Sequence, residues 1–266
     1  MDLTLLQAGL AALSGAAVGF SLGLVGGGGS ILAVPLLYYV VGIGSPHLAI
    51  GTSSVAVAAS AAMGLANHAR AGTVKWPCAI AFAVAGVVGA AIGAEFGKAI
   101  DGHLLLGLFG LLMIAIGASM LLPRRGGERP EVQLNRASAR RLLPVLVIAG
   151  LIVGFASGFF GIGGGFLIVP GLVAATAMPI VNAIGSSLVS VTAFGATTAV
   201  SYALSGFVDW AVALIFIAGG IVGTIAGTRL SHSLAGRGRT LTFIFAGIVI
   251  VAGIYVALRA FMQVGG

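Results

Sequence analysis

Charged residues are scarce in this sequence. Asp, Glu, Lys and Arg make up only 7% of its 266 residues, whereas an average soluble domain has about 25%. Apolar residues make up 59%, which leaves too little polar surface to cover a water-soluble globule. Apolar content this high also excludes a disordered chain. The composition therefore predicts an integral membrane protein.

Cysteine and carboxylate side chains are few as well. Cys78 is the single cysteine, so the chain can form neither an internal disulfide nor a thiolate metal cluster. The six carboxylates fall at the ends of apolar segments or in a polar linker, away from mid-membrane positions where a proton relay would be expected. The four histidines are widely spaced, without the pattern of a metal site. We therefore predict no enzyme, no metal site and no cofactor.

Basic residues outnumber acidic ones, which gives a net charge of +7. They lie between apolar segments, where basic residues set membrane topology and meet anionic lipid. The sequence has no basic aromatic face of the kind that binds a nucleic-acid backbone. The expected partners are the lipid bilayer and a small solute, and nucleic acid is not expected.

Long apolar runs predict ten helical segments. Runs of about 20 apolar residues exclude an outer-membrane β-barrel, whose strands alternate over about 10 residues. The segments are approximately 3–22, 30–42, 48–68, 76–98, 104–122, 142–160, 166–177, 183–205, 210–230 and 241–258. The stretch between the two groups of five holds six arginines. We predict a first transmembrane repeat over 1–122, a cytoplasmic basic linker over 123–141 and a second repeat over 142–266.

The two halves are copies of each other. Three motifs recur in one register with a single one-residue gap: GLVGGGGSILAVP at 23–35 and GFFGIGGGFLIVP at 158–170, AIGTSS at 49–54 and AIGSSL at 183–188, and GTVKW at 72–76 and GFVDW at 206–210. Such agreement predicts an internal duplication. Glycines spaced by four, at 89, 93 and 97 and at 219, 223 and 227, are assigned to close helix packing.

Two segments in matching places are too short to cross a bilayer. A helix over 30–42 or 166–177 spans roughly 20 Å, against a hydrocarbon core of about 30 Å. Each follows a glycine-rich break, and matched broken helices in two halves indicate the binding site of a transporter. Whether these segments span the membrane or re-enter it stays open at this point.

Charge favours an inverted arrangement of the two halves. If each half crosses the membrane an odd number of times and the linker is cytoplasmic, eleven of the thirteen basic residues lie inside. If each half crosses four times, only nine do. The positive-inside rule therefore predicts an all-α polytopic membrane protein with two inverted-topology repeats of about five helical segments each, and short glycine-broken helices near the midplane.

The predicted binding site consists of neutral hydrogen-bond donors. A helix that restarts after a glycine break directs unpaired N–H groups and a positive dipole end at a ligand, and such an end binds anions without a fixed charge. Hydroxyls follow in both halves, and the two-fold would bring both sets together near the midplane. The candidate substrate-binding residues are Gly26, Gly27, Gly28, Gly29, Ser30, Thr52, Ser53, Ser54, Gly163, Gly164, Gly165, Ser186 and Ser187.

Two other interpretations apply to these positions. The serines lack the elbow motif and the positioned base of a hydrolase, so an intramembrane enzyme is disfavoured. Helix packing by small residues remains an alternative to binding. His68, Arg70 and Tyr202 are candidate coupling or gating residues, because they occupy equivalent or adjacent positions at segment ends.

The combined motifs resemble the sulfite exporter TauE/SafE family, whose repeat reads approximately GxGGGGxxxxP, then AxGTS, then HxxxGxVxW. The first half carries these at 26–35, 49–53 and 68–76, and the second at 161–170, 183–187 and 206–210. The second copy departs in having Ile162 within the glycine run and Tyr202 in place of His68. The resemblance implies secondary transport of sulfite or of an organosulfonate such as sulfoacetate, usually outward across the bacterial inner membrane. A carrier or channel for another small solute and a non-transporting scaffold are the alternatives.

Overall fold

The computed structural model describes residues 4–25, 27–121, 136–161, 165–233 and 238–264. All regular elements in these ranges are helical. The first half contains α1 (Leu5–Val25), the 3₁₀ helix η1 (Gly27–Leu32), α2 (Ala33–Pro35), the π-helical turn η2 (Leu36–Val40), α3 (Pro46–Arg70), α4 (Trp76–Ala99) and α5 (Gly102–Leu121). The second contains α6 (Arg136–Phe160), α7 (Gly165–Thr176), α8 (Ile180–Leu204), α9 (Trp210–Ser233) and α10 (Gly238–Val264). Within these residues, eight helices are long and apolar enough to cross a membrane. The all-α polytopic prediction is confirmed.

The boundary of the linker differs from the prediction. Helix α6 begins at Arg136, so the last six residues of the predicted linker are helical. Arginine is a good helix former, and the basic turns at the start of α6 extend beyond its apolar span, which begins at Arg140. Polar residues such as these can continue a membrane helix beyond its apolar span.

The two short apolar segments differ in regularity. In the first, hydrogen bonding changes from 3₁₀ through α to π around Pro35, whose ring nitrogen has no N–H to donate. In the second, α7 stays α-helical through Pro170. Helix α3 then begins as a capped helix, since Ser45 Oγ accepts a hydrogen bond from the Leu48 N–H at 3.1 Å and Pro46 takes the first position.

Glycines let the helices of the two halves touch through their backbones. A Cβ on Gly15 or Gly19 of α1 would collide with the backbone of Phe216 or Gly220 in α9. The same holds between α4 and α6, where glycines of each helix face backbone of the other: Gly89, Gly93, Gly154 and Gly158. Van der Waals contact at this range is the main way helices associate in lipid. The packing role predicted for the spaced glycines is confirmed.

These contacts also give the relative directions of the helices. Helix α1 runs parallel to α9, because residues 15 and 19 lie against 216 and 220. By the same reasoning α4 runs parallel to α6, while α5 is antiparallel to α10, with Gly110 against Ala257 and Gly117 against Ile250. The central helices α3 and α8 are antiparallel, with Gly51 against Phe207 and Gly64 against Leu188. Counterparts in the two halves thus run in opposite directions.

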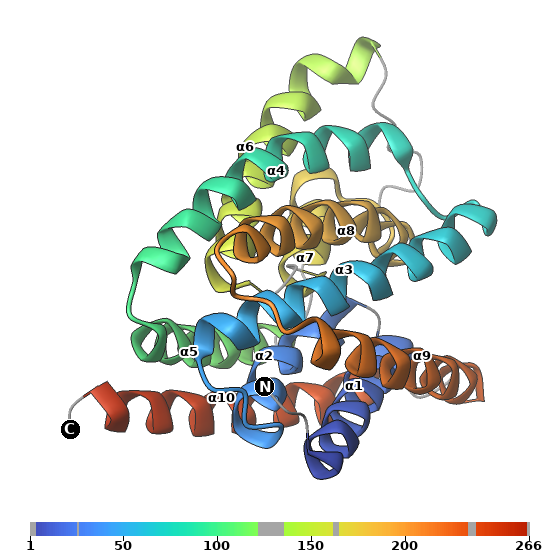
Figure 1. Cartoon of the computed structure of the whole chain (residues 1–266). Helices are drawn as coiled ribbons and strands as arrows, with labels where there is room; N and C mark the ends of the chain where they lie inside the picture. Colours follow the sequence, from blue (N-terminus) through green and yellow to red (C-terminus); the bar gives the residue numbers. More distant parts are fainter. Residues whose placement is uncertain (1–3, 26, 122–135, 162–164, 234–237, 265–266) are drawn as a thin grey trace.

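Helices α3 and α8 lie at the centre of the molecule. Figure 1 shows the α4–α6 pair on one side of them and the α1–α9 pair on the other, with α7 between. Burial reflects this arrangement, since 61% of the α8 span is buried, against 28% of the α1 and α6 spans. The residues predicted to bind substrate on α3 and α8 are therefore held in the most enclosed part of the fold.

Candidate functional site

The hydroxyl groups predicted to bind substrate are all buried. None of them is more than 1% exposed: Ser30, Thr52, Ser53, Ser54, Ser186 and Ser187. In this conformation these side chains do not reach water on either face. A solute could contact them only after the helices around α3 and α8 move.

Two of these hydroxyls hold equivalent loops in place. Thr52 Oγ1 accepts a hydrogen bond from the Asp209 N–H at 3.0 Å, and Ser186 Oγ accepts one from the Lys75 N–H at 2.9 Å. Thr52 corresponds to Ser186 and Lys75 to Asp209 in the internal repeat. Each bond therefore ties the loop before α4 or α9 to a central helix of the other half.

Ser53 and Ser187 form a second equivalent pair. The hydroxyl of Ser53 donates to the Ile50 carbonyl and that of Ser187 to the Ile184 carbonyl, both at 2.8 Å. Such bonds back to the same helix satisfy a hydroxyl in an apolar interior. The two carbonyl groups each belong to a helix and do not depend on the serine hydroxyls. Each hydroxyl can therefore turn from its carbonyl and donate to a ligand oxygen instead.

The second glycine break packs against the first repeat. Gly161 has a φ of +65°, which favours glycine, and a Cβ there would collide with the side chain of Ile50. The Ser54 hydroxyl lies 2.9 Å from the Gly161 carbonyl and 2.8 Å from that of Ile50, so one proton is shared between two acceptors. The counterpart of Ser54 is Leu188, so this contact exists on one side only.

The two short segments meet each other. Helix η1, which contains Gly27, Gly28 and Gly29, contacts α7, which begins at Gly165. Ile31 and Phe166 belong to one buried apolar cluster. Gly26, Gly163 and Gly164 lie outside the described residues. The described parts of the two glycine-led helices are thus brought together, as expected.

The two groups of hydroxyls are not brought together at one midplane position. The antiparallel register of α3 and α8 places Gly51 against Phe207 and Gly64 against Leu188. Ser53 and Ser187 therefore lie toward opposite ends of the pair, separated by about 18 Å along the helix axis at 1.5 Å per residue. One group of hydroxyls faces each end of the molecule instead.

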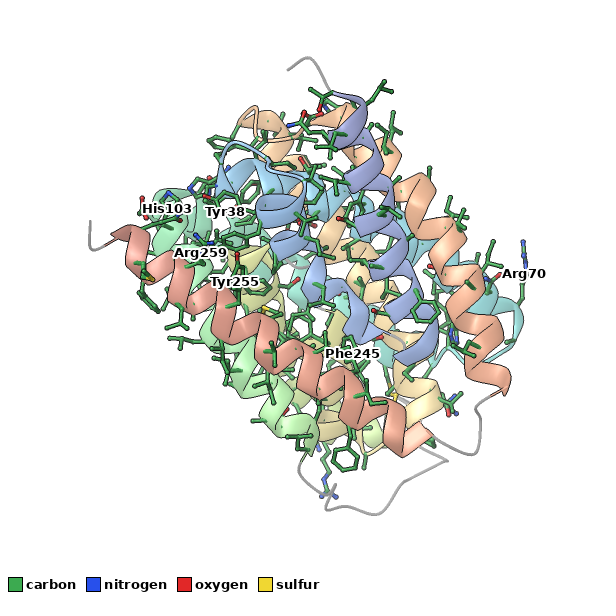
Figure 2. All side chains as sticks on the ribbon, turned by 90° about the horizontal axis from the view of Figure 1, so that it is seen from below. Tyr38, Arg70, His103, Phe245, Tyr255 and Arg259 are labelled. Atoms are coloured by element: carbon green, nitrogen blue, oxygen red, sulfur yellow. The ribbon has the colours of Figure 1, made fainter. Side chains whose placement is uncertain are left out.

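The candidate gating residues also lie at opposite ends. His68 is in the last turn of α3, where its Nδ1 lies 2.8 Å from Thr73 Oγ1. Tyr202 is in the last turn of α8, where the Lys98 ammonium sits 6.0 Å from its ring centroid. Figure 2 shows Arg70 on the far side of the molecule from His103. His68 and Arg70 therefore lie at one end of the molecule, and Tyr202 lies at the other.

Charged side chains of the described residues gather at the ends of the spans. Lys98 pairs with Glu95 at 2.8 Å and donates to Ser205 Oγ at 3.0 Å. Asp101 accepts hydrogen bonds from the N–H groups of Leu104 and His103, and these bonds hold its pKa below the ordinary value. The interior between the two ends therefore presents dipoles and hydroxyls rather than fixed charges.

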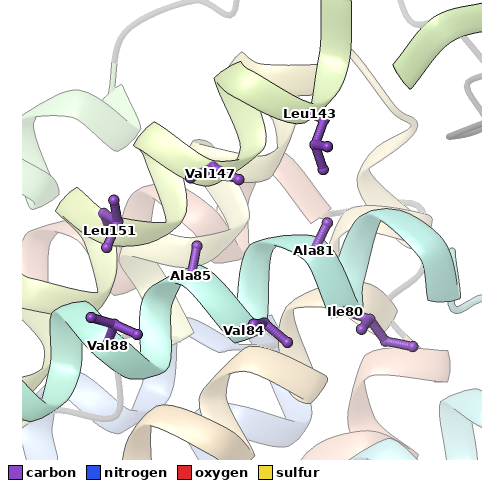
Figure 3. Close-up of a pocket in the computed structure, with 8 residues that line it drawn as sticks. All are labelled: Ile80, Ala81, Val84, Ala85, Val88, Leu143, Val147 and Leu151. Atoms are coloured by element: carbon purple, nitrogen blue, oxygen red, sulfur yellow. The ribbon is translucent and has the colours of Figure 1, made fainter. Parts of the chain in front are cut away.

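An open groove of about 520 Å³ runs along the outside of α4 and α6 (Figure 3). Its lining is apolar throughout: Ile80, Ala81, Val84, Ala85, Val88, Leu143, Val147 and Leu151. Val84 is 65% exposed on this surface. These side chains offer no hydrogen-bond donor to an anion, so the groove is not a candidate anion site.

Comparison with known proteins identifies the family of this chain. Residues 11–256 match the family described as sulfite exporter TauE/SafE. The chain belongs to this family. The match extends from α1 to α10 and so includes all or part of every helix described above.

Several relatives are similar over nearly their whole length. A probable membrane transporter protein of Xylella fastidiosa strain 9a5c is 50% identical over 247 residues, covering 93% of this chain and 94% of the relative. The probable membrane transporter protein YjnA of Bacillus subtilis is 30% identical, covering 91% and 96%. One from Methanocaldococcus jannaschii is 27% identical, covering 91% and 93%. No solved structure matches the chain. As a TauE/SafE family member, the chain is a multi-pass membrane protein of a transporter family.

Three further buried hydroxyls of this TauE/SafE family member were not among the site residues predicted from the sequence. Ser157, Ser190 and Thr198 are fully buried, and their oxygens have no hydrogen-bond partner. Their counterparts in the first half are Leu22, Ala56 and Gly64. A signal for them was available, because a polar residue in one repeat stands where the other repeat is apolar.

Proposed function

We propose that this protein is a secondary transporter that exports a small sulfur-containing anion, such as sulfite or an organosulfonate, across the inner membrane. The observation that carries the proposal is the contact between two glycine-led short helices, η1 and α7, in an interior without fixed charge. Helix N-termini and hydroxyls suit an anion, and the family description names sulfite export.

Neutral donors favour transport over tight binding. A hydrogen bond to a charged group contributes about 1.5–3 kcal/mol, and a few of them give only moderate affinity. An exporter must release its cargo, so moderate affinity is suitable. A site without fixed positive charge should accept several small oxyanions, which differ mainly in size.

The proposal is tested by flux. Purified protein in lipid vesicles should move sulfite or sulfoacetate faster than empty vesicles, with and without a pH gradient, and inorganic cations should not compete. Uptake of none of these sulfur oxyanions under either condition would reject the substrate class. A strong preference for a cation would reject the anion site itself.

We further propose that the repeats are inverted in the membrane, with the linker in the cytoplasm. The opposite directions of counterpart helices support this, as does the gathering of basic residues at the Arg70 end. In a Cys78→Ala background, single cysteines at residues 70 and 237 should be labelled from the linker side, and those at 98 and 209 from the opposite side. Labelling of residues 209 and 237 from the same face would contradict inverted repeats.

Removal of the equivalent serines should weaken transport moderately. Ser53→Ala and Ser187→Ala are each expected to reduce anion flux by about tenfold or less, since each removes one charge-assisted hydrogen bond, and the double variant should be worse. Ser119→Ala is the matched control, because the Ser119 hydroxyl makes the same type of bond to the Ile116 carbonyl but is exposed. Equal flux in the double variant and the wild type would remove these serines from the site.

A further inference from the structure

A stripe of buried residues runs along α8 at intervals of four: Ser186, Ser190, Phe194, Thr198 and Tyr202, here called the α8 stripe. Every member is fully buried. Residues four apart lie on neighbouring turns of one helix side. The stripe faces α4, since Ser186 bonds to the Lys75 N–H and Phe194 lies against Gly86. The Tyr202 hydroxyl completes the series, 3.2 Å from where a Cβ of Gly97 would lie.

Three of the four polar members of the stripe lack the usual hydrogen bond of a buried hydroxyl, and Ser186, which accepts one from the Lys75 N–H, is the fourth. Thr192 and Thr197, on the same helix, donate to the carbonyls four residues earlier at 2.7 and 2.8 Å. The oxygens of Ser190, Thr198 and Tyr202 have no partner. An unpaired buried polar group costs free energy, and such groups in native proteins need a reason.

Most of the unpaired hydroxyls among the described residues belong to the second half, and Tyr39 Oη is the exception in the first. Ser157 on α6 is a further one, and it precedes Gly158, which lies against Ala90 of α4. Because α4 is parallel to α8 and its Gly86 faces Phe194, Ser157 falls at about the level of Thr198. Leucine, alanine and glycine take the places equivalent to Ser157, Ser190 and Thr198 in the first half, so packing of this fold does not require hydroxyls there.

The stripe connects the two ends of the protein. Ser186 lies at the Lys75 end and Tyr202 beside Lys98 at the other, about 24 Å apart at 1.5 Å per residue. It therefore spans the interval between the two separated groups of candidate hydroxyls. A solute that leaves one group would meet Ser190, then the level of Thr198 and Ser157, before it reaches the other.

We propose that the α8 stripe and Ser157 line the path of the transported anion through the second half. This inference rests on the proposed function. The three oxygens of a sulfite or sulfonate group accept hydrogen bonds from the unpaired hydroxyls in turn, and the anion needs no fixed charge at any step. Phe194 is stacked on Phe82, with ring centroids 6.2 Å apart, and separates Ser190 from Thr198. It closes the path in this conformation and must move for a solute to pass.

Adjacent threonines on α8 provide the test. Thr198→Val keeps the shape of the side chain but removes the unpaired hydroxyl, and we expect sulfite or sulfoacetate flux in vesicles to fall about tenfold, with Ser190→Ala acting in the same direction. Thr197→Val, whose hydroxyl is bonded to Ala193, should transport as the wild type does. Both variants should insert and unfold normally in detergent. Unchanged flux in Thr198→Val and Ser190→Ala, with an active wild type, would overturn the path and leave the proposed function standing.

A second measurement tests the path without measuring transport. In a Cys78→Ala background, cysteines at 190 and 198 should react with a small water-soluble methanethiosulfonate that carries a sulfonate group, and sulfoacetate should slow the reaction. A cysteine at 197 should show no such protection. If neither cysteine reacted, water would not reach positions 190 and 198, and the proposed path would be rejected. Reaction at these positions without flux of any sulfur oxyanion would support the path and reject the proposed function.

Discussion

Gly161→Val is expected to abolish transport in a protein that still inserts into the membrane. The substitution forces a β-branched residue to a φ of +65°, which costs about 1–3 kcal/mol by itself. The new Cβ also collides with Ile50 and displaces the carbonyl that Ser54 contacts. Anion flux in vesicles, normalised to protein in the membrane fraction, should fall to the level of empty vesicles.

Gly206→Val is the control that distinguishes the effect of backbone strain from the effect of the collision with Ile50. Gly206 also has a positive φ, +76°, but a Cβ there meets no atom within 4 Å. This variant should lose some stability and keep most of its flux. If both variants lost transport equally, strain alone would explain the loss and the Gly161–Ile50 contact would have no special part in transport.

Gly19→Leu is expected to separate α1 from α9. A Cβ on Gly19 would overlap the backbone of Gly220, so the helices must move apart over their whole glycine contact. Overpacking of this kind costs about 1–3 kcal/mol, which corresponds to a fall of about 2–12 °C in Tm for a chain of this size. Thermal unfolding of the purified protein in detergent measures the change.

Two further variants make this prediction specific. Gly9→Leu lies on the same helix, where a Cβ meets nothing within 4 Å, and it should unfold like the wild type. Gly154 is the counterpart of Gly19 and lies against the backbone of Gly86, so Gly154→Leu should destabilise α4–α6 to a similar degree. A stable Gly19→Leu protein would show that the backbone contact of α1 with α9 adds little to stability.

Much of the fold could be predicted because its main signals are local. Apolar length gave the eight long helices, and the glycine breaks with matched lengths gave the two short ones, 27–40 and 165–176. The duplication predicted which segment of one half corresponds to which segment of the other, since each motif has one counterpart. The start of α6 at Arg136 was missed, because a charged turn at the end of a membrane helix is composed like a loop.

The site could be predicted only in part, because register between helices is not a local property. The motifs identify Ser53 and Ser187 as equivalents, but their separation depends on which residues of α3 and α8 face each other, and the contact of Gly64 with Leu188 decides that. Likewise nothing in the neighbourhood of Thr52 indicates that its hydroxyl would bond to Asp209, 157 residues away. The contrast between Thr198 and its counterpart Gly64 is visible in the sequence, but the lack of a hydrogen-bond partner for Thr198 is visible only in the structure.

The pairing of α1 with α9 sets an order of events during synthesis. Gly19 meets Gly220 across about 200 residues of chain, which a ribosome adds in roughly 10–40 s at 5–20 residues per second. The glycine contacts of α4 are mainly with α6, which is made much sooner after it. Until α9 is made, the glycine face of α1 therefore lacks the helix that covers it in the folded protein.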